Sequence, residues 1–147
     1  MPALTKVAMQ FQVFMLRRQW MGQMGDFVMV ITTTGRKSGK TFSTPIGYVR
    51  EGENYVALTN GGAVQSHWYQ NVRAHPRATL EVQGQHLTVR AEFLDDPASR
   101  AQARMLFQQQ RAAHFKSFFG VTIDAPAEEI ERAVASRVFV RFQPVVD

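Results

Sequence analysis

Residues 27–41 read Phe27-Val-Met-Val-Ile-Thr-Thr-Thr-Gly-Arg-Lys-Ser-Gly-Lys-Thr41. The first eight residues are rich in β-branched side chains, which favour a strand. Gly35 and Gly39 then bound a basic loop, and residues 42–49 continue as a strand rather than as a helix. A strand that enters a glycine-bounded loop and leaves it as another strand predicts a β-rich fold.

The other expected strands come as hairpins. Segments 43–50 and 54–60 flank a short turn at Gly52, and segments 78–82 and 86–93 flank Gly84. A closing strand is expected over 138–142. Because strands outnumber helices and do not alternate with them, we expect a mainly β fold with flanking helices (α+β), built on a barrel of six or seven antiparallel strands.

Helical patterns flank the expected barrel core at residues 26–93. Apolar residues recur at helical spacing in the N-terminal segment 1–24. A short helix is expected over 66–75, ended by Pro76. In segment 97–147, a capped helix over 98–110 and a second helix after Pro126 precede the closing strand. The 147 residues are expected to form a single domain.

Composition narrows the function classes. The chain carries a formal charge of +5 and no cysteine, which favours anionic partners and excludes disulfides, thiolate metal sites and cysteine nucleophiles. No secretory leader pattern and no membrane-length apolar run is found in the sequence, so we expect a cytoplasmic protein. The basic flank of the N-terminal helix leaves a weak membrane contact open.

The basic loop resembles a P-loop but fails on spacing. A P-loop has four residues between its first glycine and the Gly-Lys pair, whereas here there are three, and no helix follows. Arg36, Lys37 and Lys40 still place three cations within five residues, and Ser38 adds a hydroxyl donor. Two interpretations stay open on these residues alone: a phosphate-binding anion nest, or a solvated hairpin tip.

Three further features follow the same order along the chain. Hydroxyl residues at 32–34 and 43–44 can donate neutral hydrogen bonds to a ligand, although threonine is also common in strands. The glycine pair at 61–62 permits close approach of a ligand, and Trp68 offers a flat wall for an aromatic ring. Taken singly, the hydroxyl run is better explained by the preference of threonine for strands, and a core tryptophan with a tight turn explains the glycine pair and Trp68 as well as a ligand does.

Taken in order, these motifs resemble the deazaflavin-dependent nitroreductase family of actinobacterial type. The residues that carry the resemblance are Thr-Thr-Thr-Gly-Arg-Lys-Ser-Gly-Lys at 32–40, Thr44-Pro45, Asn60-Gly61-Gly62-Ala63, and the run from Trp68 to Pro76. The resemblance implies a split β-barrel related to FMN-binding proteins. It also implies a hydride-transferring oxidoreductase that uses reduced coenzyme F-420, an 8-hydroxy-5-deazaflavin, with FMN as the alternative flavin.

The resemblance also implies which residues bind the cofactor. Its phosphate and acidic tail would lie at Arg36, Lys37, Ser38, Gly39 and Lys40, and its ring system at Thr44, Pro45 and Ile46. Ala57, Thr59, Asn60 and Gly61 would line the other strand, with His67 and Trp68 closing the pocket. The sequence departs from the family's well-studied nitroreductase at Asn60, which replaces a lysine, and at Phe42, which replaces an arginine.

A hydride donor needs a positioned acceptor rather than a nucleophile. We expect a lipophilic or aromatic acceptor such as a quinone or nitro compound, and His67, Tyr48 and His114 are the candidate proton donors. The four histidines lack metal-ligand spacing, so no metal site is expected. The alternative is a non-enzymatic split-barrel protein that binds a fatty acid, haem or another flavin. A homodimer stays open, and no nucleic-acid partner is expected.

Overall fold

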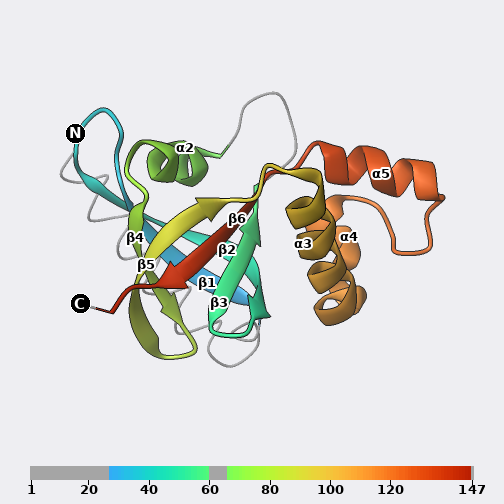
Figure 1. Cartoon of the computed structure of the whole chain (residues 1–147), viewed down its shortest axis with the longest axis horizontal. Helices are drawn as coiled ribbons and strands as arrows, with labels where there is room; N and C mark the ends of the chain where they lie inside the picture. Colours follow the sequence, from blue (N-terminus) through green and yellow to red (C-terminus); the bar gives the residue numbers. More distant parts are fainter. Residues whose placement is uncertain (1–26, 60–65, 147) are drawn as a thin grey trace. The chain divides into compact units, whose positions relative to one another are not determined.

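Six strands form the barrel of the computed structural model, which describes residues 27–59 and 66–146. The barrel is closed in the order β1-β2-β3-β6-β5-β4 (Figure 1), and every strand pair with a defined register is antiparallel. The strands are β1 (Val28–Thr34), β2 (Thr41–Glu51), β3 (Asn54–Leu58), β4 (Arg77–Val82), β5 (Gln85–Phe93) and β6 (Phe139–Pro144). The predicted antiparallel barrel and both predicted hairpins are confirmed. The predicted N-terminal helix lies outside the described residues.

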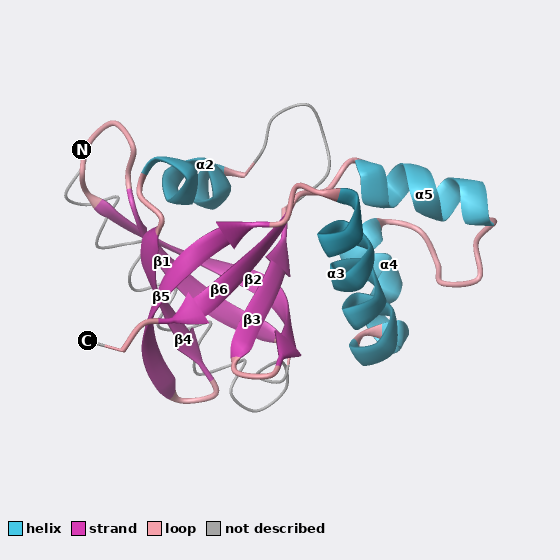
Figure 2. Ribbon diagram, viewed as in Figure 1, coloured by secondary structure: helices cyan, strands magenta, loops and turns pink. Residues whose placement is uncertain are grey.

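Three helices occupy predicted segments, and two short helices are additions. The described helices are α2 (His67–Ala74), α3 (Pro97–Gln110), the 3-10 helix η1 (Ala112–His114), α4 (Phe115–Phe119) and α5 (Ala127–Ala135), shown in cyan in Figure 2. The 3-10 helix η1 and the short helix α4 are the additions that were not predicted. No described helix has the length and apolar character that crossing a membrane requires.

The described residues fall into two compact units, each built from more than one stretch of the chain. Unit 1 contains residues 27–46, His67–Arg90 and 144–146, and unit 2 contains residues 47–59, 66 and Ala91–Gln143. The single domain expected from the sequence stays a prediction.

Unit 1 is built on the pairing of β1 with β4. Ile31 lies opposite Leu80 in this register, and both side chains are fully buried. Along β4, the side chains of Ala78, Leu80 and Val82 are buried whereas Arg77 and Thr79 are exposed, which is the period of two of a half-buried strand. Helix α2 packs against β1. The carboxyl end of β1 therefore enters the basic loop beside α2.

Unit 2 has an aromatic core. Phe107 of α3 contacts the rings of Phe118 and Phe119 of α4 and of Phe139 of β6, with centroid separations of 5.2, 5.8 and 6.0 Å. Phe115 joins the same buried cluster, together with aliphatic residues of α5. Each fully buried aromatic side chain contributes about 1.5–3 kcal/mol to folding. Phe115 and Phe119 are therefore core residues.

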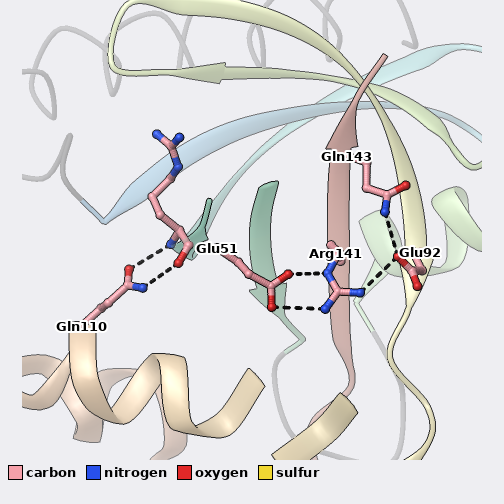
Figure 3. Close-up of polar contacts among 6 residues, drawn as sticks. Glu51, Glu92, Gln110, Arg141 and Gln143 are labelled. Carbon is pink, nitrogen blue, oxygen red and sulfur yellow. Dashed lines mark hydrogen bonds and ion pairs between the residues drawn. The ribbon is translucent and has the colours of Figure 1, made fainter. Parts of the chain in front are cut away.

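A polar network ties together three strands of unit 2 (Figure 3). Arg141 of β6 donates from Nε and Nη2 to the carboxylate of Glu51 in β2 at 2.6 and 3.2 Å, and from Nη1 to Glu92 of β5 at 3.2 Å. The hydrogen bond with Glu51 is the main cause that raises the pKa of Arg141. The amide of Gln110 accepts from the backbone N–H of Arg50 and donates to its carbonyl, which fixes the end of α3 to β2.

Candidate functional site

The basic loop, defined as residues 35–40, is closed by its own backbone. The N–H of Gly35 donates to the carbonyl of Lys40 at 2.6 Å, and the N–H of Gly39 donates to the carbonyl of Gly35 at 3.0 Å. Gly39 has a φ of +73°, in the left-handed region that glycine enters without steric cost. A Cβ on Gly35 would lie 2.6 Å from Cε2 of Phe42. The shape of the loop therefore requires both glycines.

Four of the loop's six backbone N–H groups are used within the protein. Besides the two glycines, the N–H of Lys40 donates to Oγ of Ser38 at 3.2 Å, and that of Arg36 donates to Oδ1 of Asn71 at 3.3 Å. Across residues 27–59 and 66–146, the N–H groups of Lys37 and Ser38 meet no acceptor. The Ser38 hydroxyl proton also stays available, because its oxygen serves as acceptor. The N–H donors available to an anion are thus confined to residues 37 and 38 of the loop.

The three cations of the loop are not neutralised by ion pairs within the described residues. Lys37 and Lys40 are exposed and Arg36 is half-buried. None of the three pairs with a carboxylate in the described part of the chain. Because cations without carboxylate partners and N–H donors without acceptors together favour an oxyanion, the loop has the donor chemistry of a phosphate site.

Asn71 of α2 was not predicted as a site residue, yet it organises the loop. Its Oδ1 accepts from Nη1 of Arg36 at 2.9 Å as well as from the Arg36 backbone, and its Nδ2 donates to Oγ1 of Thr33 at 3.1 Å. Asn71 is only 4% exposed. The available signal was its spacing, since a residue three positions after the buried Trp68 lies on the same helix face.

The predicted hydroxyl residues are partly engaged with one another. Oγ1 of Thr32 and Oγ of Ser43 lie 2.8 Å apart, which joins β1 to β2 on either side of the basic loop. Thr33 is buried, and its Oγ1 accepts a hydrogen bond from Nδ2 of Asn71. These hydroxyls therefore support the frame of the loop.

The other predicted residues of unit 1 lie on β2 and α2. Thr44 and Pro45 are half-buried on β2, and Ile46 is buried. At the start of α2, His67 is exposed, whereas Trp68 is buried and packs edge-to-face with Tyr69 at a centroid separation of 6.3 Å. The structure brings Thr44, Pro45, Ile46, His67 and Trp68 into the unit that carries the basic loop.

The predicted residues of the other strand belong to unit 2. Ala57 is fully buried in β3. Thr59 follows β3 and extends its pairing, because its N–H donates to the carbonyl of Val138 and its Oγ1 accepts from the Val138 N–H. The Thr59 carbonyl accepts from Nη1 of Arg137 at 3.3 Å. Asn60 and Gly61 lie outside the described residues.

The three candidate proton donors differ in exposure. Tyr48 is 1% exposed, and the centroid of its ring lies 5.6 Å from that of Tyr55 and 5.5 Å from the guanidinium carbon of Arg111. His67 and His114 are exposed. Within the described ranges, no group of three or more His, Cys, Asp or Glu side chains is arranged to hold a metal ion.

Comparison with known proteins identifies a matching family. The family model described as F-420H(2)-dependent quinone reductase matches residues 4–122, which is more than half of the chain.

Solved structures of similar fold share little sequence with this chain. An F-420-H2 dependent reductase (FDR-A) is similar with a TM-score of 0.55 and 21% identity, over 79% of this chain and 93% of that chain. A protein described as a domain-swapped dimer gives 0.58 and 19%, over 91% and 98%. The heme storage protein HutZ from Vibrio cholerae gives 0.57 and 11%, over 88% of each chain. This likeness identifies the fold as the split β-barrel of flavin-reductase type.

Proposed function

Because the chain belongs to the F-420H(2)-dependent quinone reductase family, it is an oxidoreductase that uses coenzyme F-420, and we propose that it passes a hydride from the reduced cofactor to a lipophilic or aromatic acceptor. Quinones and nitro compounds are the acceptor classes with suitably electron-poor atoms. A quinone is the acceptor that the family description names.

The observation that carries the proposal is the free donor set of the basic loop. Coenzyme F-420 bears a phosphate and an acidic tail, and both need cations and N–H donors. Lys37 and Lys40 are exposed and without carboxylate partners in the described part of the chain, and the N–H groups of Lys37 and Ser38 meet no acceptor there. These residues fit the anionic part of the cofactor, and we assign them to it.

The protein's own residues have binding and positioning roles in this proposal. When bound, the reduced deazaflavin supplies the hydride. The basic loop holds the phosphate, and the half-buried Thr44 and Pro45 of β2 are proposed to face the ring, together with Ile46. Trp68 and His67 are proposed to complete the pocket, and Ala57, Thr59, Asn60 and Gly61 stay predictions from the family resemblance. The exposed His67 and His114 are suited to exchange a proton with the acceptor.

A titration of the full chain with coenzyme F-420, followed by fluorescence or calorimetry, tests the proposal. Lys37→Ala should weaken binding by about 10-fold or more, because a charged hydrogen bond to phosphate contributes about 1.5–3 kcal/mol. Arg132→Ala is the matched control, since it removes one positive charge from an exposed position on α5. It should leave the affinity within about 2-fold of that of the unaltered chain.

Two results would contradict the proposal. A folded sample that does not bind the cofactor at tens of micromolar would reject the function. Equal affinities of Lys37→Ala and Arg132→Ala would reject the assignment of the basic loop to the phosphate. We also infer a homodimer, supported by the dimeric neighbour of similar fold, and light scattering on the purified chain tests it.

A further inference from the structure

One neutral oxygen holds Arg36 at two points. Oδ1 of Asn71 accepts from the Arg36 backbone N–H at 3.3 Å and from its Nη1 at 2.9 Å. A guanidinium has five N–H donors, and in the described part of the chain the others of Arg36 have no acceptor. Asn71 therefore fixes both the backbone and the side chain of Arg36 and leaves most of its donors unused.

The orientation of the Asn71 amide is determined by its surroundings. Its Nδ2 donates to Oγ1 of Thr33 at 3.1 Å, and Thr33 is 2% exposed. A flipped amide would point its NH2 group at the two N–H donors of Arg36, which leaves buried donors without acceptors. Thr33 in β1 and Asn71 in α2 thus form a rigid support beneath the start of the basic loop.

The neutrality of this support matters as much as its rigidity. An aspartate at position 71 would reach Arg36 with nearly the same shape, but its carboxylate would cancel the guanidinium charge and attract the donors more strongly. The asparagine orients Arg36 without that cancellation. A ligand oxyanion therefore meets an oriented guanidinium with its full charge.

We propose that Asn71 is a positioning residue that makes the site selective for the phosphate-bearing deazaflavin over the same ring system without phosphate. This inference rests on the proposed function. Asn71 does not need to touch the cofactor in this role, because it acts through Arg36.

The test compares two ligands and three variants of the full chain. The ligands are coenzyme F-420 and 8-hydroxy-5-deazariboflavin, which has the ring but no phosphate. Asn71→Asp should weaken binding of coenzyme F-420 by about 10-fold or more while changing the affinity for the phosphate-free ligand by less than about 2-fold. Arg36→Ala should produce the same pattern. Adding the neutral Asn71→Ser to Arg36→Ala should cause no further loss, because Asn71 acts through Arg36.

The outcomes separate this inference from the proposed function. If the unaltered chain binds coenzyme F-420 but Asn71→Asp weakens both ligands equally, or neither, the positioning role is wrong and the function stands. If the unaltered chain binds neither ligand, the proposed function and the positioning role of Asn71 are both rejected. Should Asn71→Asp not fold, Asn71→Ser removes the orientation without adding charge and should again weaken only coenzyme F-420. An unchanged preference in a folded Asn71→Ser variant would overturn the proposal.

Discussion

Replacing Glu51 by glutamine tests how much the network around Arg141 stabilises unit 2. The substitution keeps the shape of the side chain but removes a carboxylate that accepts two hydrogen bonds from Arg141, at 2.6 and 3.2 Å. The two side chains are 20% and 15% exposed, so water screens the pair only in part. A hydrogen bond to a charged group contributes about 1.5–3 kcal/mol to the free energy of unfolding. Because Arg141 keeps Glu92 as a partner, we expect a loss of about 2 kcal/mol in the free energy of unfolding.

The matched control is Glu92→Gln, which removes the other carboxylate from the same arginine. Glu92 is 49% exposed and contacts Arg141 at 3.2 Å, so its contribution should be at most about 1 kcal/mol. Urea unfolding of both variants, at constant m value, measures the difference. Repeating it in 1 M NaCl, where the Debye length is about 3 Å, should reduce the effect of Glu92→Gln more than that of Glu51→Gln. Equal losses in the two variants would refute this account of burial.

Two other predictions concern packing and pH. Gly47→Ala should cost about 1–3 kcal/mol of stability by thermal or urea unfolding, because the new Cβ would lie 2.1 Å from Cε1 of Phe118; adding Phe118→Leu should recover part of the loss, and no recovery would assign the cost elsewhere. Asp96 caps α3 by accepting from the Ser99 N–H at 2.9 Å. Hydrogen bonds from the Ser99 side chain and then from its backbone N–H lower the pKa of Asp96 from its ordinary value of 3.8. Its stabilising effect is therefore present above that pH and is lost as the pH falls through the lowered pKa. Asp96→Ala should lower the melting temperature more at pH 7 than at pH 2, whereas Asp96→Asn, which still caps without a charge, should change it less at pH 7; equal losses for Asp96→Ala at both pH values would contradict a contribution from the carboxylate charge.

The strands could be predicted because their signals are local. Alternation of buried and exposed side chains along β4 and the glycine turns at Gly52 and Gly84 are visible within ten residues of sequence. The N-cap of α3 is equally local, since Asp96 and Ser99 are three positions apart. Predicted element bounds therefore agree with the structure to within a few residues.

Helix α4 could not be predicted in the same way. Its five residues include three phenylalanines, which have no strong helical preference. What holds the segment is packing of Phe115, Phe118 and Phe119 in the cluster around Phe107. Contacts of this kind join segments that sequence patterns treat separately, and they also explain why Phe115 and Phe119 are core residues.

The candidate site was predictable in composition but not in detail. The charges and glycines of the basic loop are evident in the sequence, whereas the engagement of four of its N–H groups depends on the loop's conformation. The contact between Arg36 and Asn71 spans 35 positions and exists only because α2 packs on β1. In the sequence, the one indication of a role for Asn71 was its position, because a polar residue three positions after Trp68 lies on the buried face of the short helix.

The closure of the basic loop by its own backbone makes it suitable for transplantation. A backbone hydrogen bond between Gly35 and Lys40 closes the loop, and among the described residues Asn71, itself bonded to Thr33, is the one outside the loop whose side chain bonds directly to it. To build a similar oxyanion site between two strands of another barrel, a designer would therefore need a loop like residues 35–40 and an asparagine placed as Asn71 is. In this chain, the proposed anion site occupies very little sequence.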